Sequence, residues 1–322
     1  MPLDAIQALI GADMQAVDRV IRSRLNSEVV LIRQISEYII GSGGKRLRPM
    51  LVLLSSGLFG YRGTRHHELA AIVELIHTAT LLHDDVVDES ELRRGRQTAN
   101  ALFGNAASVL VGDFLYSRAF QMMVDVDRMR VMAVLSEATN VIAEGEVLQL
   151  LNIHEPDINE ERYLQVIRYK TAKLFQAATR LGAILGDASS ADEEAMADYG
   201  MHLGTAFQLI DDVLDYSGDN QATGKNVGDD LAEGKPTLPL IYAMQRGNTD
   251  QAAAVRHAIV HGGRDDLDRV VAAIRDTGAL DYARGRAGEE ADAACAAIAH
   301  LPHSTYMDSL LQLASFAVTR NY

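Results

Sequence analysis

The chain has 322 residues, 48% of them hydrophobic, and a formal net charge of −14. This charge argues against non-specific nucleic-acid binding, which depends on neutralising phosphates with Lys and Arg, so we expect no nucleic-acid partner. No stretch approaches the roughly 20 uninterrupted apolar residues that a membrane span needs. The amino terminus lacks the features of a signal peptide, and the single cysteine, Cys295, has no internal disulfide partner. We therefore expect a soluble protein of the reducing cytoplasm.

Helical periodicity runs through nearly the whole chain. Apolar runs of helical period continue from Ala5 to Val318, only six prolines occur, and no linker rich in Ser, Gly or Pro separates two halves. No segment alternates as a strand does. The predicted helices are 4–22, 26–40, 45–60, 66–89, 105–125, 129–150, 159–186, 192–217, 236–246, 250–261, 264–277, 280–300 and 304–320. The pattern predicts an all-α protein with one domain over 1–322.

A glycine-rich turn precedes the third predicted helix. GGKRLRP at 43–49 places three cations at the entrance of a helix, where backbone N–H groups and the helix dipole also favour an anion. In outline this is a phosphate site, although such sequences are also common in solvated turns.

The next predicted helix carries an acidic motif. Asp84-Asp85-Val86-Val87-Asp88 follows an apolar run, and its acids at i and i+4 share one helical face. Like charges so placed repel, and the interior of a helix tolerates them only when a cation neutralises them. His77 lies two turns before Asp84 on the same face, and Arg93, Arg94 and Arg96 follow the motif.

The same pattern recurs at Asp211-Asp212-Val213-Leu214-Asp215, after another apolar run. Gln208 precedes it on nearly the same face, and Lys170-Thr171 lies on a separate predicted helix. A long polar loop with Lys225 and Lys235 follows, as in many functional lids.

Two such motifs predict a metal site that binds a diphosphate. Oxygen ligands without His or Cys favour Mg²⁺, which keeps waters and completes its shell with substrate phosphates. For one motif alone, a solvated helix end or turn is the alternative.

Five segments, matching in order and spacing, resemble the trans-isoprenyl diphosphate synthases over essentially the full chain. They are GGKRLRP at 43–49, LLHDDVVDESELRRGRQT at 81–98, KTAKLF at 170–175, GTAFQLIDDVLDY at 204–216 and GKNVGDDLAEGKPTLPL at 224–240. GDFLYSRAFQMM at 112–123 and AEGEVLQL at 143–150 are similar to long-chain bacterial members that make the octaprenyl side chain of ubiquinone. The resemblance implies a homodimer, each subunit a single helical bundle around a deep central cavity.

The resemblance also implies roles for individual residues. The metal ligands would be Asp84, Asp85 and Asp88 with Asp211 and Asp215, holding three Mg²⁺ ions per site when diphosphate is bound. With Asp212, Lys170 and Lys225, these acids form the expected catalytic set. Contacts to the allylic diphosphate would come from Arg93, Lys170, Thr171, Gln208, Lys225 and Lys235. The diphosphate of isopentenyl diphosphate would be held by Lys45, Arg48, His77 and Arg94. Basic tails close over the site in relatives, and the short Arg320-Asn321-Tyr322 is a weaker match.

The expected reaction is a sequential head-to-tail condensation of isopentenyl diphosphate onto an allylic diphosphate such as farnesyl diphosphate. Product length should follow from the cavity floor, and Thr80 and Ala79 lie roughly 6–8 Å along the helix from Asp84. Both are small, so a growing chain can pass. The candidates for the deeper floor are Ile76, Val73, Met122 and Met123. We expect a C40 product, with C45, C50, the preferred primer and transient membrane contact during release left open.

Four alternatives remain at this stage. A terpene cyclase shares the helical cavity, but its second metal motif normally has a different pattern. A subunit of a heteromeric synthase is a second alternative, although non-catalytic subunits typically lose one acidic motif. A shorter-chain synthase is a third. The last is a di-iron bundle, prompted by Glu74-Leu75-Ile76-His77, for which the chain has no second Glu-x-x-His.

Overall fold

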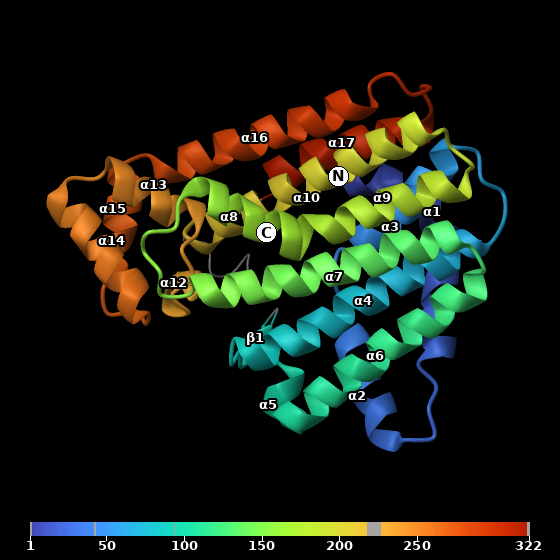
Figure 1. Ribbon diagram of the computed structural model, residues 1–322, viewed down its shortest axis with the longest axis horizontal. Helices are drawn as coiled ribbons and strands as arrows, with labels where there is room; N and C mark the ends of the chain where they lie inside the picture. Colours follow the sequence, from blue (N-terminus) through green and yellow to red (C-terminus); the bar gives the residue numbers. More distant parts are fainter. Residues whose placement is uncertain (1, 42, 94, 218–226, 321–322) are drawn as a thin grey trace. The chain divides into compact units, whose positions relative to one another are not determined.

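The computed structural model describes residues 2–41, 43–93, 95–217 and 227–320. Within these residues the protein is helical apart from one hairpin, in which β1 (Leu92–Arg93) pairs antiparallel with β2 (Arg96–Gln97) (Figure 1). The predicted all-α fold is confirmed. The hairpin was not predicted, because strands of two residues are too short for alternation to reveal them. None of the described helices is long and apolar enough to cross a membrane.

The chain folds into two compact units, each assembled from separate stretches of sequence. Unit 1 comprises Met1–Thr139, Leu174–Gly200 and Ala297–Leu313, and unit 2 comprises Asn140–Lys173, Met201–Ala296 and Ala314–Tyr322. We predicted a single domain over 1–322. That the two units form one domain stays a prediction.

Unit 1 is organised around one central helix. Its elements, some shared with unit 2, are α1 (Pro2–Arg24), α2 (Val30–Ile40), α3 (Leu47–Leu58), α4 (Arg65–Val87), α5 (Ala99–Phe103), α6 (Asn105–Val126), the first part of α7 (Met129–Asn152), most of α9 (Lys173–Leu185) and the beginnings of α10 (Ser190–Asp215) and α17 (Thr305–Thr319). Helix α4 packs against α1, α3 and α6. Its side chains Val73, Leu75 and Ile76 are all fully buried, as expected of a helix surrounded by others. The core of unit 1 therefore fixes the position of the first acidic motif.

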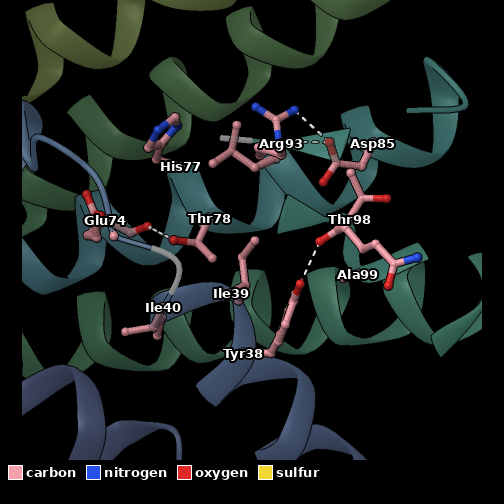
Figure 2. Close-up of a pocket in the computed structure, with 13 residues that line it drawn as sticks. Tyr38, Ile39, Ile40, Glu74, His77, Thr78, Asp85, Arg93, Thr98 and Ala99 are labelled. Carbon is pink, nitrogen blue, oxygen red and sulfur yellow. Dashed lines mark hydrogen bonds and ion pairs between the residues drawn. The ribbon is translucent and has the colours of Figure 1, made fainter. Parts of the chain in front are cut away.

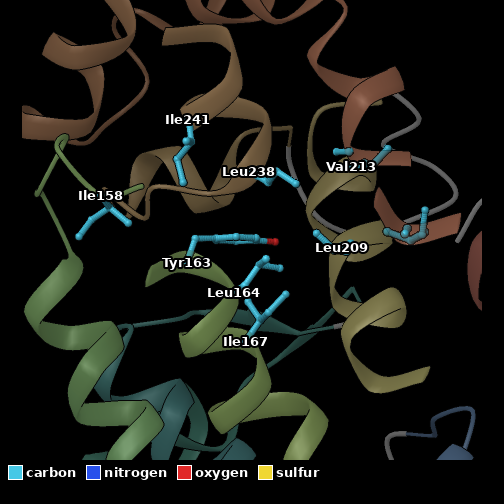
Figure 3. Packing of buried hydrophobic residues seen from close by; sticks show 11 residues of the cluster. Ile158, Tyr163, Leu164, Ile167, Leu209, Val213, Leu238 and Ile241 are labelled. Atoms are coloured by element: carbon cyan, nitrogen blue, oxygen red, sulfur yellow. The ribbon is translucent and has the colours of Figure 1, made fainter. Parts of the chain in front are cut away.

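Unit 2 contains the second acidic motif. Besides the remaining parts of α7, α10 and α17, its elements are α8 (Glu160–Ile167), the π-helix η1 (Arg168–Ala172), α12 (Asp229–Ala232), α13 (Leu238–Arg246), α14 (Thr249–His261), α15 (Leu267–Asp276) and α16 (Ala279–Ile298). Helices α13, α14 and α15 pack on one another (Figure 1). A buried cluster joins Tyr163 and Leu164 of α8 to Leu209 of α10 and to Leu238 and Ile241 of α13 (Figure 3).

The predicted helix 159–186 is in fact interrupted. A π-helical turn at Arg168–Ala172 separates α8 from α9 and contains Lys170 and Thr171. Gly145 of α7 lies against this turn, and a Cβ added there would lie 2.6 Å from the backbone nitrogen of Lys170. Only glycine permits so close an approach. Single π-turns within helices are frequent at functional sites.

The other predicted helices have counterparts with boundaries shifted by a few residues. The largest shift is in α2, which begins at Val30 rather than at 26. The short helices α5 and α12 were not predicted, because elements of 5 and 4 residues hardly show a helical period.

Candidate functional site

The first acidic motif lies at the C-terminal end of α4, close to where the predicted helix 66–89 ends. The helix ends at Val87, and Asp88 is its C-cap, with its N–H bonded to the Asp84 carbonyl at 2.8 Å. The helix dipole places partial negative charge at this end, so the carboxylates repel it as well as one another. A simple solvated helix end is therefore electrostatically unfavourable here, and the arrangement favours a bound cation.

The middle acid of this motif is buried, whereas Asp84 and Asp88 stay partly exposed. Arg93 Nε and Nη2 lie 2.8 and 2.6 Å from Asp85 Oδ1 (Figure 2). Asp85 Oδ2 has no hydrogen-bond partner among the described residues. Burial raises the pKa of Asp85, and Arg93 opposes that rise. Asp85 therefore anchors Arg93, while the outer two acids keep part of their surface exposed to solvent.

Hydrogen bonds to the backbone fix the segment that carries Arg93. Asn100 Nδ2 donates to the Asp85 carbonyl at 3.1 Å, and Thr98 Oγ1 donates to the Ser90 carbonyl at 2.7 Å. These bonds tie the β1–β2 hairpin to the end of α4. The chain thus turns back over the first motif and brings Arg93 to Asp85.

A pocket in unit 1 gathers several predicted site residues. Gly43, His77, Asp85 and Arg93 all line it, together with side chains from α2 and α4 (Figure 2). Glu74 also lines it, a carboxylate that would repel an anion on its own. An imidazole, a guanidinium and a glycine turn at one pocket are suited to binding an anionic group.

The three cations of the glycine-rich turn have different surroundings. The Arg46 backbone has a left-handed conformation, with φ of 50°. Its guanidinium contacts Asp18 at 2.8 Å and Glu74 at 3.7 Å. Arg46 therefore neutralises the carboxylate in the pocket wall. Lys45 is partly exposed just before α3, and the Arg48 guanidinium lies 4.6 Å from the centre of the Phe175 ring.

The other basic residues that were expected to contact a substrate are paired or lie outside the described part of the chain. Lys170 Nζ lies 2.6 Å from a Glu146 oxygen, and Lys235 Nζ lies 2.5 Å from a Glu233 oxygen. Arg94 and Lys225 lie outside the described residues, as do Asn321 and Tyr322.

The second motif repeats the burial pattern of the first. It occupies the last turn of α10, where Asp212 is buried and Asp211 and Asp215 are partly exposed. Asp215 accepts hydrogen bonds from the backbone N–H groups of Asp229 and Asp230 at 3.2 and 3.3 Å. In both motifs, then, the acids at the first and fifth positions keep exposed surface and the acid at the second position is buried.

A chain of hydrogen bonds holds Asp212. Tyr163 donates its hydroxyl to Oδ2 at 2.5 Å, Gln208 Nε2 donates to Oδ1 at 2.8 Å, and Thr171 Oγ1 donates to Gln208 Oε1 at 3.2 Å. Burial, followed by the charge of Asp230, raises the pKa of Asp212 to about 8. The chain links α8, η1 and α10, and it brings the predicted residues Thr171 and Gln208 together through contacts with the protein itself.

No feature of the sequence indicates that Tyr163 belongs to the site, and Arg320 stands out there only as part of a short basic tail. Nothing in the spacing of α8 connects Tyr163 with a motif 49 residues away, and only its place in the buried cluster reveals the link (Figure 3). Arg320 Nη2 lies 2.6 Å from Asp211 Oδ1, and its guanidinium stacks 3.7 Å from the centre of the Phe207 ring. The basic character of the tail was the feature of the sequence that could have pointed to the role of Arg320.

The predicted chain-length residues belong to the core of unit 1. Val73, Ile76 and Ala79 are fully buried on α4, and Met122 and Met123 are 1% exposed on α6, which packs beside α4. Thr80 keeps some exposed surface, and its hydroxyl donates to the His77 carbonyl at 2.8 Å.

Carboxylates alone make up the donor set of both motifs, which suits a hard cation such as Mg²⁺. In the part of the chain that the structure describes, neither motif gathers three ligand atoms within 4.8 Å of one another. Mg²⁺ usually takes one or two carboxylates and completes its shell with water and substrate phosphate, so this open arrangement fits the ion.

Comparison with known proteins agrees with this arrangement. Residues 29–276 match the family model described as Polyprenyl synthetase. Octaprenyl diphosphate synthases of Haemophilus influenzae and Escherichia coli are each 54% identical to the chain, covering all of it and 98% and 100% of their own lengths. A polyprenyl synthase from Caulobacter crescentus, solved as a complex with calcium and isoprenyl diphosphate, superposes with a TM-score of 0.96 at 45% identity, covering 99% of this chain and 98% of that one.

The fold and these matches define a prenyltransferase of isoprenoid metabolism. The chain belongs to the polyprenyl synthetase family, and its activity is that of a trans-polyprenyl diphosphate synthase. The di-iron alternative is thereby removed.

Proposed function

We propose that this enzyme makes a long-chain all-trans product of eight isoprene units by adding isopentenyl diphosphate to an allylic diphosphate such as farnesyl diphosphate. The observation that supports this product length is the 54% identity to two octaprenyl diphosphate synthases over the whole chain. A Rhodobacter capsulatus relative named as a nonaprenyl synthase is more distant, at 48% identity. The proposed role of the product is the side chain of ubiquinone.

We further propose that Mg²⁺ is the metal, with three ions per active site when diphosphate is bound. Its ligands would be Asp84 and Asp88 in the first motif and Asp211 and Asp215 in the second, the acids that keep exposed surface. The Caulobacter crescentus relative forms a complex with calcium, which supports a hard divalent ion. When bound, such ions stabilise the negative charge that develops on a leaving diphosphate.

The side chains of the pocket in unit 1 supply the proposed binding of isopentenyl diphosphate. His77 lines that pocket, Lys45 and Arg48 belong to the neighbouring glycine-rich turn and α3, and Arg94 follows Arg93. A held diphosphate keeps the alkene close to the allylic carbon, so attack becomes effectively intramolecular. Arg93, oriented by Asp85, would contact the allylic diphosphate, as would Lys170, Thr171, Gln208, Lys225 and Lys235.

No side chain needs to act as a nucleophile in this scheme. The allylic C–O bond breaks, the alkene forms the new C–C bond, and one proton leaves the resulting cation for the departing diphosphate. The protein's own contribution is to orient the two diphosphates with cations and to exclude water that would quench the allylic cation.

We also propose that the enzyme is a homodimer. Helix α6 exposes Leu110 and Val124, with 67% and 65% of their surface accessible, which is costly for a helix that has no partner. Light scattering on the eluting peak of a sizing column tests this directly. A mass of a single 35.1 kDa chain would contradict it.

The decisive experiment is incubation with farnesyl diphosphate, radiolabelled isopentenyl diphosphate and Mg²⁺, followed by sizing of the dephosphorylated products. A ladder that ends at eight units would establish the proposed product. A ladder ending at nine or ten units, or at four, would replace it with another length class. No elongation by a folded protein would favour a subunit of a heteromeric synthase or a cyclase.

A further inference from the structure

A cluster of metal-binding side chains lies in unit 1, outside the site described above. His66 and His67 begin α4, and Asp13 lies on α1, which packs against α4. One ligand atom from each of the three lies within 4.8 Å of the others, and among the described residues no other group of three meets that distance.

The donor atoms converge on one point. His67 Nε2 lies 2.8 Å from Asp13 Oδ1, and His66 Nε2 lies 3.5 Å from the same oxygen. The two imidazole rings are 4.0 Å apart between centres and tilted by 41°. Tyr61 packs its ring edge-on against His66, with 5.4 Å between the centres, and so restricts the rotation of that imidazole. Two imidazoles are thus held side by side with the same nitrogen facing one carboxylate.

The cluster is largely enclosed and has one side open to solvent. The side chains of His66 and His67 are 12% and 16% exposed, and that of Asp13 is 40% exposed, so an ion could enter from the Asp13 side.

We propose that Asp13, His66 and His67 form a site for a borderline transition-metal ion, Zn²⁺ in the first instance, that fastens α1 to the start of α4. Two imidazoles and one carboxylate are a donor set that Zn²⁺ accepts and that Mg²⁺ does not favour. The site lies 17 residues before Asp84, roughly 26 Å along the axis of α4, and is separate from the acidic motif. This inference is independent of the proposed product and substrates.

Zinc binding is measured by equilibrium dialysis of the full-length, tag-free protein, with saturating Mg²⁺ present to occupy the acidic motifs. Wild type is expected to hold one more Zn²⁺ per chain than His66→Gln, His67→Gln or Asp13→Asn. Each variant should bind at this site at least about tenfold more weakly. His66→Gln keeps the His67 to Asp13 hydrogen bond, so it removes a metal ligand while leaving the link between α1 and α4 intact.

His257 provides a matched control. It pairs with Asp266 at 2.7 Å and stacks on His261 with ring centres 4.0 Å apart, yet this trio does not meet the distance that defines the first cluster. His257→Gln is expected to bind zinc like wild type. With Cu²⁺ as the probe, electron paramagnetic resonance should show coupling to two imidazole nitrogens in wild type and to one in His66→Gln.

Zinc should also raise the melting temperature of wild type but not that of His66→Gln, because the ion binds the folded state. Equal zinc content in wild type and the three cluster variants would overturn the proposal and leave a plain His–Asp link between helices. Loss of the zinc in His257→Gln, or only in Asp84→Ala and Asp211→Ala, would overturn it as well.

Discussion

At the scale of single residues, the acids of each motif divide into two kinds. Asp85 and Asp212 are buried and bonded to Arg93 and Tyr163, whereas the acids on either side of them keep exposed surface. A buried carboxylate orients its neighbours, and an exposed one can exchange its waters for a metal ion. Each acidic motif therefore combines a buried structural anchor with two partly exposed carboxylates.

The exposed acids lead to a first prediction. Asp84→Ala and Asp211→Ala should each lower turnover by at least about a hundredfold, because the charge on the leaving diphosphate loses its stabilisation. The helical circular dichroism should stay unchanged, since neither side chain is buried. Asp125→Ala, which removes a carboxylate that is 52% exposed beside Arg24, is the control. Wild-type turnover in either motif variant would contradict the assignment of the ligands.

The buried acids lead to a second prediction. Tyr163→Phe removes a donor to Asp212 and leaves a buried carboxyl short of one partner, which should lower the free energy of unfolding by about 1–3 kcal/mol. Tyr282→Phe also removes a hydroxyl bonded to a carboxylate, Glu160, but at a partly exposed site, and its loss should be smaller. Urea unfolding of both variants makes the comparison. Equal losses of unfolding free energy in the two variants would mean that the buried bond to Asp212 stabilises the fold no more than the partly exposed bond to Glu160.

At the scale of elements, the end of α17 meets the end of α10. Arg320, just beyond α17, is bonded to Asp211, a proposed ligand, and 42% of the Asp211 side chain is exposed. A guanidinium on that carboxylate competes with Mg²⁺ for it. The Arg320 side chain is only 2% exposed, so the pair should be stronger than the roughly 1 kcal/mol of a fully exposed one, and Arg320→Ala should reach half-maximal activity at a Mg²⁺ concentration at least about fivefold lower. Arg320→Lys keeps the charge and should resemble wild type, whereas a raised requirement in Arg320→Ala would show that Arg320 assists substrate binding instead.

Three elements of unit 2 meet at Glu290 of α16. Its carboxylate accepts from Arg168 of η1 at 3.0 Å and from His202 of α10 at 2.5 Å. Burial alone would raise the pKa of Glu290, but His202 and Arg168 together lower it below its usual 4.5. The resulting stability is present above pH 4.5 and is lost as the pH falls through the lowered pKa.

Glu290→Gln tests this dependence on pH. At pH 6 the variant should be less stable than wild type, and the difference should shrink as the pH falls below about 4.5. Urea unfolding across that range measures it. Glu289→Gln changes an exposed neighbour paired with Arg286 and serves as the control. A difference between wild type and Glu290→Gln that does not vary with pH would contradict the prediction.

The elements also show what sequence patterns can and cannot predict. The periodicity of α4 and α10 is local, so both helices and their acidic ends could be predicted from neighbouring residues. The π-turn at Arg168–Ala172 depends on the close approach of Gly145 from another helix, and no local pattern encodes that contact. The partners of Asp212 and Asp211 are likewise tertiary, since Tyr163 and Arg320 are 49 and 109 residues distant.

At the scale of the whole molecule, the length of the product depends on how far a growing chain can extend past α4. Ala79 is fully buried and Thr80 keeps exposed surface, so the two small residues that a growing chain is expected to pass differ in what they face. A tyrosine at 79 must displace packed neighbours, which costs about 1–3 kcal/mol, whereas one at 80 can extend into open space.

Both Ala79→Tyr and Thr80→Tyr should therefore shorten the product, to about the farnesyl or geranylgeranyl stage, because an aromatic ring one turn from Asp84 blocks the chain roughly 6–8 Å from the metal ligands. Thr80→Tyr should do so with wild-type stability, and Ala79→Tyr with a lowered melting temperature. Val260→Tyr, at an exposed position of α14, is the control for adding an aromatic ring. Sizing the dephosphorylated products gives the answer: if both variants still make the wild-type length, the chain extends along another path, and the floor does not lie on this face of α4.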